Sequence, residues 1–505
     1  KQKPLPEISE EEKPFELPGG WEWTRLINLG IWALGSGFPN VVQGSTDKEI
    51  LMCKVSDMNL EGNEKFIFST KNTISKDLAD EYKIKISEPG TIIFPKIGGA
   101  IATNKRRILV QDTAIDNNCL GIKPCDAISG EWFYLILNTL DMSKYQSGTS
   151  IPAINQSVIG SIPIALPSLK MQEKIVSYVI TLMSLCDQLE QQSLTSLDAH
   201  QQLVETLLGT LTDSQNAEEL AENWARISEH FDTLFTTEAS VDALKQTILQ
   251  LAVMGKLVPQ DPNDEPASEL LKRIAQEKAQ LVKEGKIKKQ KPLPPISDEE
   301  KPFELPEGWE WCKFGLTSEF INGDRGSNYP NKNEYVSQGI PWINTGHIEK
   351  NGTLTVTEMN FITEGKFNEL RSGKIQKGDL VYCLRGATFG KTAFVIPYET
   401  GAIASSLMII RPFITEMGGY IYNYLTSPFG RSQIYRFDNG SAQPNLSANS
   451  VMLYSFPCPP LTEQYRIFSQ VGLLHELCDK LKTRIKTAQQ TQLHLADALT
   501  DAAIN

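Results

Sequence analysis

The segment from Arg385 to Thr392, RGATFGKT, comes nearest to a recognised chemical motif. A phosphate-binding loop needs four residues between its two glycines, because its backbone N–H groups must surround the phosphates. Only three residues separate Gly386 from Gly390, and Arg385 occupies the position of the first glycine. We therefore interpret the segment as a basic glycine turn at the end of a strand, matched earlier in the chain by Lys96-Ile-Gly-Gly-Ala100.

Residues suited to catalysis or metal binding are sparse. The sequence has no Asn/Asp-Pro-Pro-aromatic tetrapeptide of the amino-methyltransferase kind and no Gly-x-Gly-x-x-Gly after a strand. Its eight cysteines include no Cys-x-x-Cys pair, and its five histidines are isolated from one another. These patterns indicate reduced thiols in a cytoplasmic protein, and we expect no catalytic residue, metal or cofactor site in this chain.

Basic and amide side chains near glycine turns favour contact with nucleic acid. Arginine can donate to guanine O6 and N7, Asn or Gln can pair with adenine, and Lys or Arg can neutralise phosphate. Taken singly, each is more often a solvated surface group, and His347 is at least as readily structural. The residues expected at such an interface are Lys96, Asn104, Lys105, Arg106, Arg107 and Tyr145 in the first half, and Arg325, Tyr329, Asn344, His347, Arg371, Lys374, Arg385, Thr388, Lys391, Arg436 and Gln443 in the second.

An internal duplication positions these residues. Residues 1–26 and 289–314 share 20 of 26 positions at an offset of 288, and after a four-residue slip the offset becomes 292. Solenoid repeats run to about 50 residues, so this longer unit is a duplicated domain with its connector. Residues 30–85 and 318–375 show little resemblance. The two copies therefore share a framework and differ in part of what it presents.

A long helix follows each domain. Apolar residues recur at alternating spacings of four and three after Ile467, and the same register begins at Ile175. Such heptad seams predict that two helices of about 39 residues, each roughly 58 Å long, bury each other as an antiparallel pair. The sequence thus predicts an α+β fold in which two similar α/β domains are separated by long helices that form an antiparallel coiled coil with pseudo-twofold symmetry.

Other segments connect these parts. The Pro-rich residues 1–20 and 289–308 are interpreted as extended linkers. Helices are predicted at 216–235, at 241–258 and after an N-cap at Ser268. They are not needed to cover the domains, so they serve either as a solvated spacer or as a docking surface. The predicted boundaries are linker 1–20, first domain 21–166, central helical region 167–288, linker 289–308, second domain 309–458 and C-terminal helix 459–505.

The charge is unevenly distributed. The net charge is −12, but residues 21–150 hold 14 basic against 15 acidic residues, and residues 309–445 hold 13 against 12. The acidic excess therefore lies in the connectors and helices, which we expect to contact protein rather than phosphate. No run of 18 apolar residues predicts a membrane span. Because the chain begins at Lys1 inside the repeated motif, we expect preceding sequence to be missing.

Several motifs together resemble the specificity (S) subunits of Type I restriction-modification systems. The resemblance covers the whole chain. The motifs are ELP-x-G-W-E-W at 16–23 and 304–311, GDLVYCLRGATFGKTA at 378–393, PSLKMQEKI at 167–175, PPLTEQYRI at 459–467, and LQLAVMGKLVPQDPNDEPASELLKRIAQEKA at 249–279.

This resemblance implies two target-recognition domains joined by long conserved helices, each domain reading half of a split site in double-stranded DNA. Half-sites about one helical turn apart are roughly 34–36 Å from centre to centre, within reach of such a helix pair. The resemblance also implies that separate modification subunits bind S-adenosylmethionine. It implies that restriction subunits, which associate with this chain through the complex, use ATP. Two equivalent surfaces predict two modification subunits. Two alternatives remain: a fused methyltransferase, and a coiled-coil adaptor without sequence-specific DNA binding.

Overall fold

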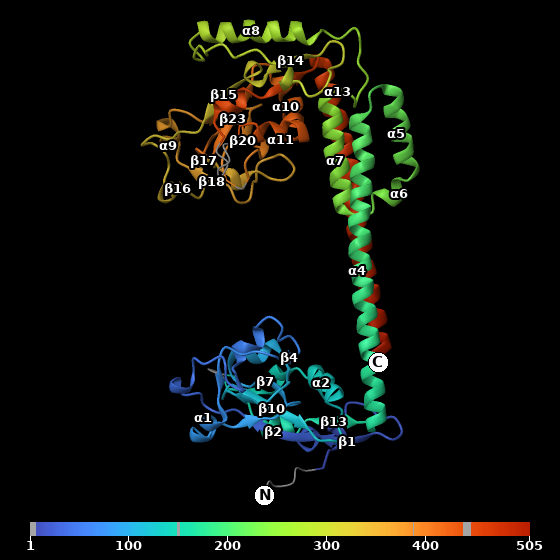
Figure 1. Ribbon diagram of the computed structural model, residues 1–505. Coiled ribbons are helices and arrows are strands. Elements are labelled where there is room, and N and C mark those ends of the chain that lie inside the picture. Colours follow the sequence, from blue (N-terminus) through green and yellow to red (C-terminus); the bar gives the residue numbers. More distant parts are fainter. Residues whose placement is uncertain (1–6, 149–151, 387, 438–445, 505) are drawn as a thin grey trace. The chain divides into compact units, whose positions relative to one another are not determined.

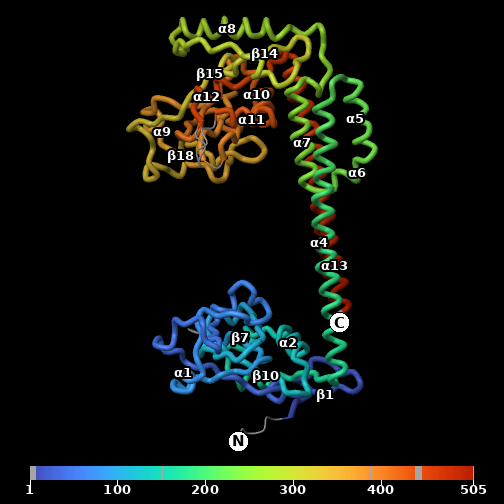
Figure 2. Tube along the Cα trace, in the orientation of Figure 1, coloured from blue at the N-terminus to red at the C-terminus, as the bar shows by residue number. Residues whose placement is uncertain are grey.

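The computed structural model describes residues 7–148, 152–386, 388–437 and 446–504, so the predicted contact Gln443 lies outside the described residues. The chain divides between Ser193 and Leu194 into two compact units, and each unit holds one mixed α/β domain (Figures 1 and 2). The two similar domains and the long helices predicted from the sequence are confirmed.

The first domain is built on two sheets, with strand orders β2-β10-β7-β8-β4 and β5-β3-β9-β6. The side chains of β7 are buried throughout, as expected for a central strand of Ile and Phe residues. Trp132 and Phe133 of α2 pack into the core beside this sheet. The elements are β1 Glu22–Arg25, β2 Gly30–Leu34, β3 Ile50–Cys53, β4 Phe66–Ile67, β5 Thr73–Ile74, α1 Lys76–Glu81, β6 Ile86–Ser87, β7 Ile92–Pro95, β8 Arg107–Leu109, β9 Thr113–Ile115, β10 Cys119–Pro124, α2 Gly130–Thr139, β11 Gln146–Ser147, β12 Ala153–Ile154, α3 Gln156–Gly160, β13 Pro163–Leu166 and α4 Leu169–Asp213.

The second domain repeats this plan in the orders β15-β23-β20-β21 and β16-β18-β17-β22-β19. Its core joins the strands to helices, with Tyr420, Tyr424 and Phe456 buried together. The elements of the second unit are α5 Ala217–Glu229, α6 Phe231–Leu234, α7 Glu238–Val253, α8 Ala267–Lys283, β14 Glu310–Lys313, β15 Ser318–Asn322, β16 Tyr335–Val336, β17 Ile340–Ile343, β18 Asn360–Ile362, α9 Glu364–Glu369, β19 Lys374–Ile375, β20 Leu380–Cys383, β21 Thr392–Phe394, β22 Gly401–Ile403, β23 Leu407–Pro412, α10 Gly418–Thr426, α11 Pro428–Tyr435, α12 Ala448–Met452, β24 Ser455–Cys458 and α13 Leu461–Ile504.

The divergent stretches share their fold despite their different sequences. In each domain one of the two sheets holds a central parallel pair between antiparallel pairs, β3 with β9 in the first and β17 with β22 in the second. Helices α1 and α9 begin at the same offset of 288, as do β6 and β19. Burial of alternate or complete strands requires only apolar side chains of suitable size, so many sequences satisfy the same framework.

The first and last strands of each domain pair with each other. Strand β1 runs antiparallel to β13, with Glu22 opposite Leu166, and β14 runs antiparallel to β24, with Glu310 opposite Cys458. The chain therefore enters and leaves each domain at one place, and the long helix begins directly beside that point. The glycine turn predicted at the end of a strand follows β20, and its counterpart at Lys96 follows β7.

The Pro-rich segments are attached to the domains rather than simply extended. In each, a Ser-x-x-Glu capping box closes a short 3₁₀ turn, Glu10–Glu12 or Asp298–Glu300. The last glutamate of each turn then pairs with a basic residue at the end of the first strand. Glu12 accepts two hydrogen bonds from Arg25, at 2.7 and 3.1 Å, and Glu300 accepts one from Lys313 at 2.6 Å.

The aromatic side chains of these segments repeat the same contact. The rings of Phe15 and Trp23 lie 5.2 Å apart, and those of Phe303 and Trp311 lie 5.1 Å apart. An ion pair and a ring contact therefore attach each segment to its domain, which limits the movement expected of a free linker.

Helix α7 covers the apolar seam of α13 in the second unit (Figure 1). Lys482 bonds Asp242 and Lys245 bonds Asp479, so the two helices run in opposite directions. The seam of α13 is buried at Cys478, whereas Leu495 near the end of the helix is 59% exposed. The expectation that the central helices are not needed to cover the domains is wrong for the second domain, because α7 packs against α10 and α11.

Helix α8 also packs on the second domain. Its Leu270 and Ile274 are buried in the same apolar cluster, and its Lys278 lies over the Phe413 ring. The predicted N-cap at Ser268 is wrong, because the helix begins at Ala267, after Pro266. The backbone N–H of Ala267 instead donates to the Gly308 carbonyl, which joins the helix start to the repeated motif.

Candidate nucleic-acid interface

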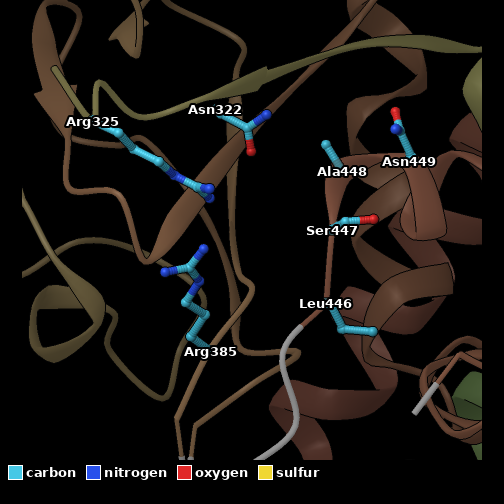
Figure 3. Close-up of a pocket in the computed structure, with 7 residues that line it drawn as sticks. All are labelled: Asn322, Arg325, Arg385, Leu446, Ser447, Ala448 and Asn449. Atoms are coloured by element: carbon cyan, nitrogen blue, oxygen red, sulfur yellow. The ribbon is translucent and has the colours of Figure 1, made fainter. Parts of the chain in front are cut away.

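Two of the predicted contact residues, Arg325 and Arg385, meet in one pocket of about 300 Å³ in the second domain. Figure 3 shows their guanidinium groups directed toward one another, with the Asn322 carboxamide beside the guanidinium of Arg325. Within the described residues, neither guanidinium has an ion-pair partner. The remaining lining residues are Leu446, Ser447, Ala448 and Asn449.

A rigid turn presents Arg325. The turn begins at Gly323, where a Cβ would lie 2.6 Å from the Ala404 carbonyl oxygen. The close approach of the chain after β15 to the chain after β22 therefore requires glycine at this position. The Asp324 carboxylate closes the turn by accepting hydrogen bonds from the backbone N–H groups of Arg371, at 2.8 Å, and Gly326, at 2.7 Å. These backbone donors lower the pKa of Asp324, which keeps the buried carboxylate ionised.

Arg385 lies two residues after the end of β20, at the start of the turn to β21 (Thr392–Phe394). The carbonyl of the preceding residue, Leu384, accepts a hydrogen bond of 3.0 Å from the backbone N–H of Leu446. This bond holds the start of the turn against the segment that leads into α12. The Nε atom of Arg385 is buried, and no described group accepts a hydrogen bond from it. An unpaired buried donor costs stability, and a ligand that accepts a hydrogen bond there would remove that cost.

The first domain builds the same framework around different side chains. The N–H of Ile154 donates to the Lys96 carbonyl at 2.8 Å, which is the equivalent of the bond between Leu446 and Leu384. The positions that correspond to Asn322, Arg325 and Arg385 hold Leu34, Gly37 and Ile97. One backbone arrangement therefore presents two arginines in the second domain and mainly apolar groups in the first.

Other predicted contacts in the second domain serve the fold. His347 is buried, its Nδ1 accepts from the Asn344 backbone N–H, and burial lowers its pKa. Lys391 donates to the Ile348 carbonyl at 3.0 Å. Arg436 pairs with Glu300 at 2.6 Å.

The rest of the predicted contacts of this domain lie at its surface or partly covered. Tyr329 packs edge-on against Trp342, and Lys374 lies 4.8 Å from the centre of the Phe367 ring. Arg371 and Thr388 are exposed, and the Thr388 hydroxyl lies 3.6 Å from the Cys383 thiol. These residues remain predicted contacts.

The basic run of the first domain has a structural role. Arg106 is 1% exposed and donates to the carbonyls of Leu137 and Leu140 at the end of α2, and to that of its neighbour Lys105. Burial lowers its pKa to about 10. Arg107 likewise donates to the Met58 carbonyl at 3.0 Å. The basic run in the sequence therefore led to a wrong prediction of Arg106 as a surface group. In sequence, an arginine that bonds the last carbonyls of a helix cannot be distinguished from a solvated one.

The neighbours of Arg106 are mixed. Asn104 adopts a left-handed backbone with φ of 49°, and its carboxamide bonds Asp141 and the Met142 N–H. Lys105 bonds the Asn59 carboxamide. Lys96 and Tyr145 are half-buried, and they remain predicted contacts.

Asn322 and Asn449 are pocket residues that the sequence prediction omitted. Asn322 ends β15, three residues before Arg325, so proximity in sequence offered a signal. Asn449 lies in a segment without basic residues, and only the fold brings it to the pocket.

A second surface feature is an apolar groove of about 600 Å³ among helices of the second unit. Trp224 of α5 is 42% exposed there, and Leu477 of α13 is 52% exposed. Exposed aromatic and aliphatic side chains at such density mark protein-binding surfaces more often than isolated apolar residues do. The groove is also lined by Leu220, Phe231, Leu244, Ile248, Leu474 and Leu481.

Two alike domains present different side chains at matching positions, and each is followed by a long helix, which is the arrangement of a two-part recognition protein. A family model described as Type I restriction modification DNA specificity domain matches residues 48–199 and 306–488, and the chain belongs to this family. It is 47% identical over 524 residues to the Type I restriction enzyme EcoAI specificity subunit of Escherichia coli, across 100% of this chain and 86% of that one. The identity to the EcoEI specificity subunit of the same organism is 42% over 535 residues, with the same coverage.

A solved chain is similar in fold. Its structure is described as showing the structural basis that underlies complex assembly and conformational transition of the type I R-M system. The TM-score is 0.51 at 16% identity, over 97% of this chain and 98% of that one. In the described part of the chain, no helix is long and apolar enough to cross a membrane. The same residues contain no group of His, Cys, Asp and Glu arranged to hold a metal ion.

Proposed function

We propose that this chain is the DNA-recognition subunit of a Type I restriction-modification complex. Each domain reads one half of a bipartite site, and the long helices fix the gap between the halves. The chain itself catalyses no reaction. The partner subunits bind and use S-adenosylmethionine and ATP. The observation that carries this proposal is the shared framework at Lys96 and Leu384, which presents different side chains in the two domains.

A reading protein needs this combination of constancy and difference. Identical frameworks place each domain on the duplex in the same way, whereas base readout requires side chains that match particular donor and acceptor patterns in the groove. Arg325 and Arg385 supply such donors in the second domain, and Leu34 and Ile97 supply apolar groups at the matching positions of the first. Two dissimilar half-sites follow from this difference.

The helical groove supports docking of modification subunits. Its walls are apolar, and α5 carries the acidic residues Glu218, Glu219 and Glu222 near Trp224. An amphipathic helix with an apolar face and basic flanks fits such a surface. Two modification subunits per chain follow if each domain and its long helix offer an equivalent site.

A selection experiment tests the proposal. The chain, combined with the modification subunits of its system, is incubated with randomised duplexes, and the bound fraction is sequenced. A bipartite sequence with a fixed gap is the expected result. Binding to the modification subunits without any enriched sequence would instead favour the adaptor. Methyl transfer by the purified chain alone, with labelled S-adenosylmethionine and DNA, would refute the division of roles.

A further inference from the structure

We propose that the pocket of Arg325 and Arg385 reads a G·C base pair in the half-site of the second domain. This inference rests on the proposed function and adds the identity of a base pair to it. Three observations support it: two guanidinium groups converge, the Nε atom of Arg385 is buried without a described partner, and the pocket is lined by both polar and apolar groups.

The charge of the pocket calls for an external acceptor. None of the described residues that line it is a carboxylate, and the nearby Asp324 already accepts the N–H groups of Gly326 and Arg371. Two guanidinium groups that face one another repel unless an acceptor lies between them. Arg385 Nε is buried without a partner among the described residues, so it is free to donate to an acceptor that enters the pocket.

The lining favours a base edge over a phosphate group. A phosphate presents only acceptors, so it could pair with the guanidinium groups but not with the acceptor oxygen of the exposed Asn322 carboxamide. The major-groove edge of G·C presents the acceptors N7 and O6 of guanine together with the N4 donor of cytosine. Arg325 and Arg385 match the acceptors, and Asn322 can accept from the donor. Leu446 and Ala448 add an apolar wall, which suits a base better than an anion.

The first domain offers an internal contrast. Its matching positions hold Leu34, Gly37 and Ile97, none of which can donate a side-chain hydrogen bond. Its backbone anchor at Lys96 and Ile154 is nevertheless the same. The G·C reading is therefore a property of the second half-site alone at this position.

Selection from randomised duplexes tests this assignment with the complex of the chain and its modification subunits. The variants are Arg325→Ala, Arg385→Ala and Arg385→Gln, and the control is Arg431→Ala, which removes an exposed arginine of α11 outside the pocket. At one G·C position of the second half-site, the alanine variants are expected to lose about 5- to 100-fold of the discrimination against other pairs. Arg385→Gln is expected to move that preference toward A·T, because Gln pairs with adenine.

The outcomes separate the two levels of the account. An unchanged first half-site in each variant shows that the complex remains assembled and that the loss is local. The inference is overturned if the wild-type second half-site contains no G·C pair. It is also overturned if each variant of Arg325 and Arg385 weakens the binding of all sequences equally and lowers the salt slope by about 1, as loss of a phosphate contact does. Absence of any enriched sequence with the wild-type chain would refute the proposed function itself.

Discussion

Replacing Glu300 with Gln should destabilise the attachment of the second Pro-rich segment more than Glu12→Gln destabilises the first. Glu300 is 18% exposed and contacts Lys313, which is 4% exposed, and also Arg436. Burial raises the pKa of Glu300, but hydrogen bonds from Lys313, the Ser297 backbone and Arg436 outweigh it and lower the pKa to about 2. Relative to the ordinary value of 4.5, this shift corresponds to about 3 kcal/mol.

The matched variant differs in what it leaves behind. Glu12 is 39% exposed, and its partner Arg25 still donates to the carbonyls of Ser161 and Glu7 when the carboxylate is gone. In Glu300→Gln, the buried Lys313 ammonium loses its carboxylate, and breaking a buried pair in this way costs about 3–5 kcal/mol. Comparison of Glu300→Gln with Glu12→Gln therefore tests how burial of the ion pair affects stability, because the sequence around the two glutamates is nearly the same.

Hydrogen exchange at pH 7 measures the difference. Amides of β14 and β24 should exchange about 100-fold faster in Glu300→Gln, since each 1.36 kcal/mol is tenfold. Those of β1 and β13 should change much less in Glu12→Gln. Because the folded pKa of Glu300 is lowered, its contribution is full above about pH 4.5 and is lost as the pH falls toward 2, so the wild type and variant should converge there. Equal effects in the two variants, or unchanged exchange in β14, would refute the reasoning.

Three further predictions concern the framework. Arg106→Ala should lower the unfolding midpoint of the first domain, since it removes the donors of three carbonyls and costs about 3 kcal/mol or more; thermal unfolding with an unchanged midpoint would show that the buried guanidinium is dispensable. Gly255→Ala should destabilise the second unit far more than Gly285→Ala, because both have positive φ but only the Cβ at 255 would overlap Pro306; equal denaturation midpoints would contradict this. Deleting residues 182–188 removes one heptad, about 10 Å of α4, and should shorten the gap between half-sites or abolish binding, while a changed half-site in the selected sequences would contradict the separation of roles.

The framework could be predicted because it depends on patterns that the sequence repeats. The motif at Lys1 and Lys289, the strands at β7 and β20 and the long helices follow from duplication and apolar spacing. The same reasoning failed for the divergent stretches, where equivalent strands such as β3 and β17 share no recognisable sequence. Burial accepts any apolar residue of suitable size there, so structure persists after similarity is lost.

The candidate site was only partly predictable for a different reason. A list of cations identifies Arg325 and Arg385, but it cannot distinguish them from Arg106 or Arg436, whose partners are distant in sequence. Carbonyl groups at a helix end and a carboxylate 136 residues away decide those roles. Only the fold brings Asn449 to the pocket, because no charge or motif marks its segment.

The central claim is that each domain determines one half-site independently of the other. Its most direct test is methylome sequencing of cells that carry the system with residues 21–157 replaced by the corresponding domain of another family member. The account predicts that one half of the methylated sequence changes, while the other half and the gap are retained. A change in both halves, or in neither, would contradict it.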